Sequence, residues 1–167
     1  LPHATERTLL IEAVFVLEAI AARRLHVDRF LPATPVRVVV NHTPVVATKH
    51  YPPAAFAGTL KKGAPYKLLE KPDIARRVIP AMLKTAQTAA EGSAKELAAE
   101  SLAAMNELLS HEMHRLRTLR QVNDNIRAGE IELAAREQQE LTAAIQGARL
   151  RLDCLRMIWK GPMELLG

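Results

Sequence analysis

The feature that most constrains the fold of this chain is residues 73–120, which carry the marks of one long helix. Asp73 is suited to cap its N-terminus, and residues 74–120 are rich in Ala, Leu, Glu and Arg. Pro80 lacks an N–H and predicts a kink or a fresh start in the first turns. A straight helix of this length would extend about 70 Å, so its apolar stripe must pack against another helix. The stripe comprises Ile79, Leu83, Ala86, Ala90, Ala94 and Leu97, followed by Leu102, Leu109 and Leu116.

A second helix is predicted over residues 129–160, after a polar break at residues 122–128. Its seam residues are separated alternately by three and four positions, which is a heptad repeat: Ile131, Ala134, Gln138, Leu141, Ile145, Ala148, Leu152, Leu155 and Trp159. The short connection makes this helix the antiparallel neighbour of the first. Glu112 and Gln138 are polar residues on these seams. We interpret them as fixing helix register or marking an opening in the seam, with a buried polar site as the alternative.

Residues 1–72 have a different composition, with eight of the ten prolines and five of the six aromatic residues. Residues 8–19 place Leu9, Ile11, Ala13, Phe15 and Leu17 on one face of a strand, although their composition also permits a helix. Residues 25–31 and 36–40 are predicted as two further extended segments. A turn at residues 41–44 leads into an extended segment at 45–48, and residues 51–71 form an irregular connection with room for one short helix.

The sequence therefore predicts an α+β fold, with a small, mostly antiparallel β-sheet followed by a long, coiled-coil-like antiparallel helical hairpin. A β-rich subdomain would occupy residues 1–72 and the hairpin residues 73–167. The chain has 167 residues, 49% of them hydrophobic, which is enough for one buried core. Because it begins with Leu1 and not with Met, we expect it to be a piece of a longer protein.

The location of the protein can be inferred from its apolar segments and its cysteine. Glu12 and Glu18 interrupt the most apolar stretch, residues 9–20, so no segment is apolar enough for a membrane-spanning helix. Cys154 is the only cysteine, which excludes an internal disulfide and a multi-thiolate zinc site. We expect a reducing, cytoplasmic location, with Cys154 as an inert thiol on the last helix.

The sequence offers little catalytic chemistry. It contains neither GxxxxGK followed by Ser or Thr nor GxGxxG, so independent ATP hydrolysis is not expected, and no catalytic or cofactor-binding residue is assigned. His111 and His114 lie three residues apart on the first helix and could share a metal ion. They lack the HExxH spacing and a third ligand, so we favour two solvated or salt-bridged histidines and expect no metal and no cofactor.

The net charge of +5 resides entirely in the first part of the chain. Residues 1–67 hold nine Lys or Arg against four Asp or Glu, whereas residues 68–167 hold fourteen of each. Interleaved aromatic residues make a nucleic-acid or partner surface a hypothesis for the basic residues of this part. The candidates are Arg23, Arg24, Arg29, Arg37, Lys61 and Lys62. Against nucleic-acid binding, these charges are scattered, and Phe15 belongs to the buried face of its strand.

Four stretches of the chain together resemble a known family. They are LIEAVFVLE at residues 10–18, RFLPATPVRVVV at 29–40, LRTLRQVNDNIR at 116–127 and ARLRLDCLRMI at 148–158. In this order they resemble the C-terminal region of the RapA family, also called HepA, whose members are bacterial RNA polymerase-associated proteins of the SWI/SNF-type ATPase superfamily. The resemblance is strongest at FLPATPVR and VNDNIR and weakest over residues 41–75.

The resemblance implies one C-terminal domain of a larger, ATP-driven translocase that binds core RNA polymerase and helps to recycle it. The nucleotide-binding motifs would lie upstream, in agreement with their absence here. The chain would then be a non-catalytic accessory domain that packs on the motor domains of its own chain and contacts RNA polymerase. The alternatives are a basic module that binds DNA or RNA and a helical dimerisation domain that forms a homodimer.

We interpret the shared motif residues as architectural. Pro32 and Pro35 fix a bend, while Phe30 and Leu31 anchor it. Asn123 and Asn125 suit a turn and a helix cap, and Ile126 can cover the end of the hairpin. Arg37 and Arg127 belong to the same two motifs.

Overall fold

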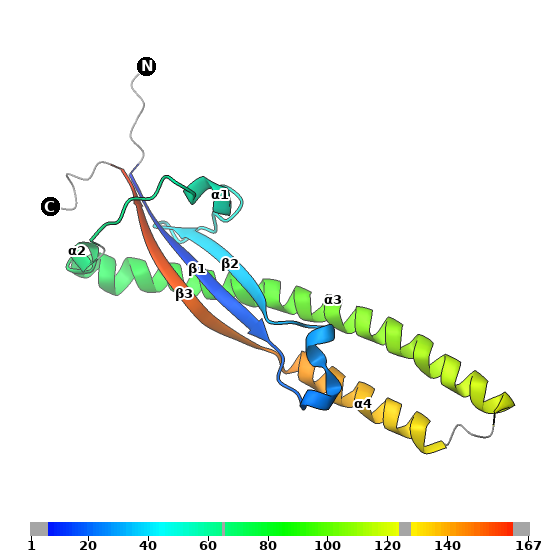
Figure 1. Cartoon of the computed structure of the whole chain (residues 1–167). Coiled ribbons are helices and arrows are strands. Elements are labelled where there is room, and N and C mark those ends of the chain that lie inside the picture. Colours follow the sequence, from blue (N-terminus) through cyan, green and yellow to red (C-terminus); the bar gives the residue numbers. More distant parts are fainter. Residues whose placement is uncertain (1–6, 65, 124–127, 162–167) are drawn as a thin grey trace. The chain divides into compact units, whose positions relative to one another are not determined.

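The computed structural model describes residues 7–64, 66–123 and 128–161, which form a small sheet and two long helices (Figure 1). The predicted α+β class is thereby confirmed. The chain divides into two compact units. Unit 1 comprises Leu1–Phe15, Pro35–Gly92 and Leu152–Gly167, and unit 2 comprises Val16–Thr34 and Ser93–Arg151.

The sheet has three antiparallel strands in the order β2-β1-β3, with β1 in the centre (Figure 1). Strand β1 is Thr8–Glu18, β2 is Thr34–Asn41 and β3 is Arg149–Lys160. The strand interpretation of residues 8–19 is confirmed, because the side chains of its apolar face are all buried: Leu9, Ile11, Ala13, Phe15 and Leu17. The strand predicted at residues 36–40 is confirmed as the greater part of β2.

Strand β3 corrects the predicted extent of the last helix. Helix α4 is Ala128–Gln146, and the twelve residues that follow Ala148 form a strand, so the prediction of a helix to residue 160 is wrong. Gly147 ends the helix, and its N–H donates to the carbonyl of Ala143. Leu152 and Leu155 are exposed and do not continue a helical seam. The sheet thus draws strands from both predicted parts of the chain, and the division into subdomains at residue 72 stays a prediction.

Two predicted extended segments are also wrong. Residues 25–31 form two 3₁₀ turns, Arg23–Leu25 and Val27–Arg29, because His26 between them adopts a left-handed conformation with φ of 47°. Residues 45–48 contribute only one antiparallel bridge, between Val46 and Val40 of β2. The turn before that bridge was predicted, and the side chain of Asn41 stabilises it by accepting from the N–H groups of Thr43 and Val45.

The irregular connection and the start of the long helix largely follow the prediction. Two short helices, α1 at Pro53–Phe56 and α2 at Tyr66–Leu69, interrupt the connection. A π-helical turn, Ile74–Val78, precedes α3, which is Ile79–Val122. Pro80 is the second residue of α3. Asp73 stands at the N-cap position before Ile74, as predicted, but its side chain makes no capping hydrogen bond and pairs with Arg77 instead.

The hairpin of α3 and α4 is confirmed up to Gln146 (Figure 1). Within unit 2 a core cluster joins the two helices to the end of β1 and to the 3₁₀ turns. Its buried members are Leu17, Leu25, Leu31, Ala94, Met105, Leu141 and Ile145. On α3 the predicted alanines are buried, but so are three methionines that the stripe did not include: Met82, Met105 and Met113. Glu112 is exposed, so its predicted place on the seam is wrong.

No helix within the described ranges is both long and apolar enough to cross a membrane.

Candidate functional site

In unit 1 the central strand carries a buried carboxylate between two guanidinium groups. Glu12 is 7% exposed, and its Oε1 accepts from Arg37 Nε at 2.5 Å. Its Oε2 accepts from Arg156 Nε at 2.7 Å, and a second nitrogen of Arg156 also contacts this oxygen. Because β1 is the middle strand, one carboxylate ties β2 on one side and β3 on the other.

The protonation of Glu12 follows from this geometry. Burial by itself raises the pKa of the carboxyl group, but the hydrogen bonds and positive charges of Arg37 and Arg156 outweigh burial and hold the pKa below its usual value of 4.5. Glu12 is therefore ionised at neutral pH. A buried carboxylate that is neutralised in this way has a structural role and is not poised to act as a general acid.

Two aromatic rings lie over this ion cluster. The Phe56 ring, at the end of α1, has the guanidinium carbons of Arg37 and Arg156 at 5.6 Å and 5.7 Å from its centroid. Tyr51 stacks on Phe56 with centroids 5.8 Å apart, and Lys160 Nζ lies 5.9 Å from the Tyr51 centroid. Such cation–π contacts anchor the connection between β2 and α2 onto the sheet. We call these six residues the ion–aromatic cluster: Glu12, Arg37, Tyr51, Phe56, Arg156 and Lys160.

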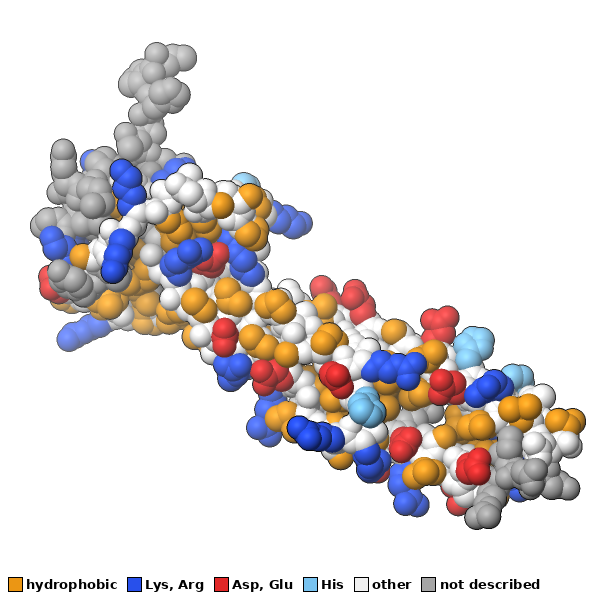
Figure 2. Space-filling model, in the orientation of Figure 1, with side chains coloured by type: hydrophobic (Ala, Val, Ile, Leu, Met, Phe, Trp, Pro, Cys, Tyr) orange, Lys and Arg blue, Asp and Glu red, His pale blue; other side chains and the backbone are white. Residues whose placement is uncertain are grey.

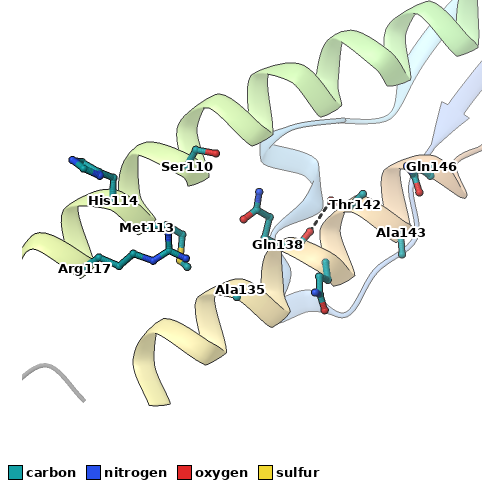
Figure 3. Close-up of a pocket in the computed structure, with 10 residues that line it drawn as sticks. Ser110, Met113, His114, Arg117, Ala135, Gln138, Thr142, Ala143 and Gln146 are labelled. Carbon is teal, nitrogen blue, oxygen red and sulfur yellow. Dashed lines mark hydrogen bonds between the residues drawn. The ribbon is translucent and has the colours of Figure 1, made fainter. Parts of the chain in front are cut away.

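In unit 2 a cleft lies between α3 and α4, with a volume of about 560 Å³ (Figure 3). Gln138 projects from α4 toward α3, where its Nε2 donates to Asn106 Oδ1 at 3.1 Å. The predicted position of Gln138 at an opening in the seam agrees with this cleft. The wall from α3 comprises Ser110, Met113, His114 and Arg117, and that from α4 comprises Ala135, Gln138, Gln139, Thr142, Ala143 and Gln146.

The six basic residues predicted as a surface are divided between the units. Arg37, Lys61 and Lys62 belong to unit 1, and Arg23, Arg24 and Arg29 to unit 2. Two of them are occupied by ion pairs, Arg37 with Glu12 and Arg24 with Glu140 on α4. Arg29 lies 5.5 Å from the centroid of the Phe30 ring, and Arg23, Lys61 and Lys62 are exposed. Their use as a nucleic-acid or partner surface stays a prediction.

The motif residues of FLPATPVR, residues 30–37, lie at the bend between the 3₁₀ turns and β2. Leu31 is buried in the core cluster of unit 2, and Phe30 packs against it. The Pro32 carbonyl accepts from the Thr34 hydroxyl at 2.8 Å, and Pro35 is exposed at the start of β2. In the motif VNDNIR, residues 122–127, Asn123 follows the last residue of α3. Asn125, Ile126 and Arg127 lie outside the described residues.

The residues considered for metal or thiol chemistry are all on the surface. His111 and His114 are exposed on α3, and His114 contributes to the cleft wall. Across the described residues, no three His, Cys, Asp or Glu side chains are grouped so that they could hold a metal ion. Cys154 is exposed on β3, so its predicted position on a helix is wrong.

Sequence reasoning missed the ion–aromatic cluster, although the sequence carries a signal for part of it. Glu12 interrupts the apolar run of β1, whose other charged residue, Glu18, is the last of the strand, and Arg37 is the single charged residue of β2. Charges within such apolar strands are buried only when they are paired. Tyr51 and Phe56 carry no comparable signal, because only the folded connection brings them over the sheet.

The charge is also divided between the units. Unit 1 holds twelve Lys or Arg against seven Asp or Glu, whereas unit 2 holds eleven of each, so the whole excess of +5 belongs to unit 1. On the face in Figure 2, blue side chains predominate over unit 1, while blue and red side chains mix along the hairpin.

The fold and these surfaces define a class of α+β domain that contains a three-stranded sheet and a helical hairpin. A family model described as "RNA polymerase recycling family C-terminal" matches residues 1–160, and the chain belongs to this family. It is 32% identical over 151 residues to the RNA polymerase-associated protein RapA of Proteus mirabilis. That match covers 90% of this chain, and the chain spans only 16% of the length of that relative.

Proposed function

We propose that this chain is a non-catalytic accessory domain of an RNA polymerase recycling factor, and that it contacts core RNA polymerase and packs on the motor domains of its own protein. The observation that carries the proposal is the family match over residues 1–160, together with the name of the relative as RNA polymerase-associated. ATP hydrolysis would then belong to the remainder of such a protein, which agrees with the absence of nucleotide-binding motifs in this sequence.

The end of the helical hairpin in unit 2 is the surface that best suits a protein partner. Val122 at the end of α3 is 82% exposed, and Leu133 in the first turns of α4 is 53% exposed. Leu119, three residues before Val122, is also exposed, and Arg117 and Arg120 supply positive charge on the same helix. Exposed aliphatic side chains with basic neighbours favour contact with an apolar, acidic protein surface.

The proposal is tested by the binding of purified core RNA polymerase to the immobilised chain. The double variant Val122→Glu with Leu133→Glu should lose most of the captured polymerase, because it places two charges on the apolar end of the hairpin. The matched control is Ala103→Glu with Ala104→Glu, which makes the same charge change at exposed positions of α3 and should bind as the unaltered chain does. If the unaltered chain captures no polymerase, the proposed contact is wrong.

A second candidate function is nucleic-acid binding by unit 1, which the net charge of +5 in this unit favours. Binding of this kind falls steeply with salt, because counterions are released from the phosphates. We expect weak binding of duplex or single-stranded DNA or RNA at low salt, and Lys61→Gln with Lys62→Gln should reduce the salt dependence. An absence of binding at low salt excludes this function.

A further inference from the structure

Across the described residues, the wall of the cleft between α3 and α4 includes a positive charge and no acidic side chain. The cleft has a volume of about 560 Å³, and all ten of its wall residues belong to unit 2. Arg117 is the charged residue, and its side chain extends into the space between the two helices (Figure 3). A cleft of this size that is lined by charge of one sign favours a ligand of the opposite sign, here an anion.

Within the ranges that the structure describes, the guanidinium group of Arg117 has no carboxylate partner. By contrast Arg24 of the same unit pairs with Glu137 and Glu140 on α4. A guanidinium group presents a planar fork of N–H donors that matches the two oxygens of a carboxylate. Arg117 is therefore available to a carboxylate from another molecule.

The apolar part of the cleft suits the stem of a glutamate side chain. Met113 is 8% exposed and lies one helical turn before Arg117 on the same face of α3. Ala135 and Ala143 on the opposite wall have short side chains, and Ser110 adds a hydroxyl donor. The methylene groups of a glutamate can contact Met113 while its carboxylate reaches Arg117.

The surroundings of the cleft disfavour a nucleic-acid strand as its occupant. Unit 2 holds eleven basic and eleven acidic residues, so it has no net charge to attract a chain of phosphates from a distance. Glu107 and Glu112 are exposed on α3, and they would repel the phosphates on either side of a bound one. A single carboxylate in an otherwise neutral segment avoids this repulsion and pairs with Arg117 at contact distance.

The cleft shares Arg117 with the surface for which contact with RNA polymerase is proposed, and the exposed Leu119 and Val122 follow on α3. We propose that the cleft receives a glutamate side chain of the protein that docks on the hairpin, and that Arg117 pairs with its carboxylate. This inference rests on the polymerase contact proposed above and names the group that enters the cleft.

The direct test is NMR titration of the 167-residue chain with a nine-residue peptide that carries one central Glu among Ala, Leu and Ser. The same peptide with Gln in place of Glu and nine-residue oligothymidine are the comparison probes. We expect only the Glu peptide to shift the Nε–H signal of Arg117 and the side-chain amide signals of Gln138, and in Arg117→Gln the shift at Gln138 should disappear. No shift at Arg117, or an equal shift with either comparison probe, overturns the proposal.

Capture of core RNA polymerase by the immobilised chain connects the cleft with the proposed contact. Arg117→Gln should weaken binding by about tenfold, whereas Arg115→Gln, exposed on α3 outside the cleft, should change it by less than about twofold. Ala143→Glu places a carboxylate of the chain itself in the cleft and should also weaken binding, with the exposed Ala103→Glu as its control.

The two measurements separate this inference from the function on which it rests. If the unaltered chain and all four variants capture polymerase equally, the cleft inference is wrong and the proposed function stands. If the unaltered chain captures no polymerase, the proposed contact fails, and the titration alone decides whether the cleft takes a carboxylate.

Discussion

At the scale of single residues, the charge of Glu12 is the feature on which unit 1 most depends. In Glu12→Gln the carboxylate that Arg37 and Arg156 share becomes a neutral amide, and two cations are left without compensation beside Phe56. Breaking a buried ion pair on one side is strongly destabilising, and because Arg156 is half exposed we expect a loss of about 2 kcal/mol in the free energy of unfolding. Urea unfolding followed by circular dichroism measures this loss.

Glu18→Gln on the same strand is the matched control. Glu18 pairs with Arg151 at 3.2 Å, but both side chains are exposed to solvent. Water screens this pair, so its loss should cost less than about 1 kcal/mol. Equal losses in the two variants would show that the burial of Glu12 contributes nothing to the strength of its pairing.

The lowered pKa of Glu12 also predicts how stability depends on pH. The folded chain binds the proton more weakly than the unfolded chain, so the unfolded chain holds more protons between the two pKa values and stability rises with pH there. The contribution of Glu12 is complete above its unfolded value of 4.5 and is lost as the pH falls through the lower, folded value. The difference in urea midpoint between the unaltered chain and Glu12→Gln should therefore shrink as the pH falls from 6 to 3. A difference that stays constant contradicts this assignment.

At the scale of elements, the sequence predicts β1 and β2 from short apolar runs that contain β-branched residues, and α3 from its helical stripe. The segment that forms β3 fits two periods. Leu152, Leu155 and Trp159 fit helical spacing, yet RLRLD at residues 149–153 alternates with the period of a strand. Pairing with β1 selects the strand over the helix, and this pairing depends on residues far away in the sequence. Gly147 is the local signal of a helix end that the heptad count ignores.

The methionines of α3 and the bend before β2 show what local pattern leaves out. Met105 is fully buried and lies three residues after Leu102 and four before Leu109, so helical spacing places it on the stripe, but a count of leucines at sevenfold spacing passes over it. Residues 25–28 alternate between apolar and polar side chains as a strand would, but the left-handed His26 turns the segment into two 3₁₀ turns, and Leu25 and Leu31 pack in the core of unit 2. The fold class follows from composition and period, whereas the contacts that complete the core depend on the folded chain.

The hairpin gives a prediction for packing between its helices. Ile145 on α4 is fully buried in the core cluster of unit 2, so Ile145→Ala should lower the free energy of unfolding by about 3 kcal/mol through lost burial and a cavity. Leu133→Ala on the same helix removes an exposed side chain and should cost less than about 0.5 kcal/mol. Thermal unfolding of the two variants makes the comparison, and similar losses would mean that α4 is not packed on the core as described.

At the scale of the whole molecule, the two units differ in charge although each draws on separate stretches of the chain. Sequence counting placed the excess in residues 1–67, and the folded chain gathers it in unit 1. Unit 2 holds as many acidic as basic residues, and Arg24 is directly paired with Glu137 and Glu140. Interspersed opposite charges cancel within about a Debye length of 10 Å, so only unit 1 should attract anions.

This division predicts the behaviour of the chain on a cation exchanger. Lys61→Gln with Lys62→Gln and Arg115→Gln with Arg136→Gln both reduce the net charge from +5 by two, and all four residues are exposed. The first pair lies in unit 1 and should clearly lower the salt concentration of elution, because it removes part of the uncompensated charge. The second pair lies in the balanced unit 2 and should lower it much less. Equal shifts would mean that the resin senses total charge alone and that the division of charge between the units has no effect on binding.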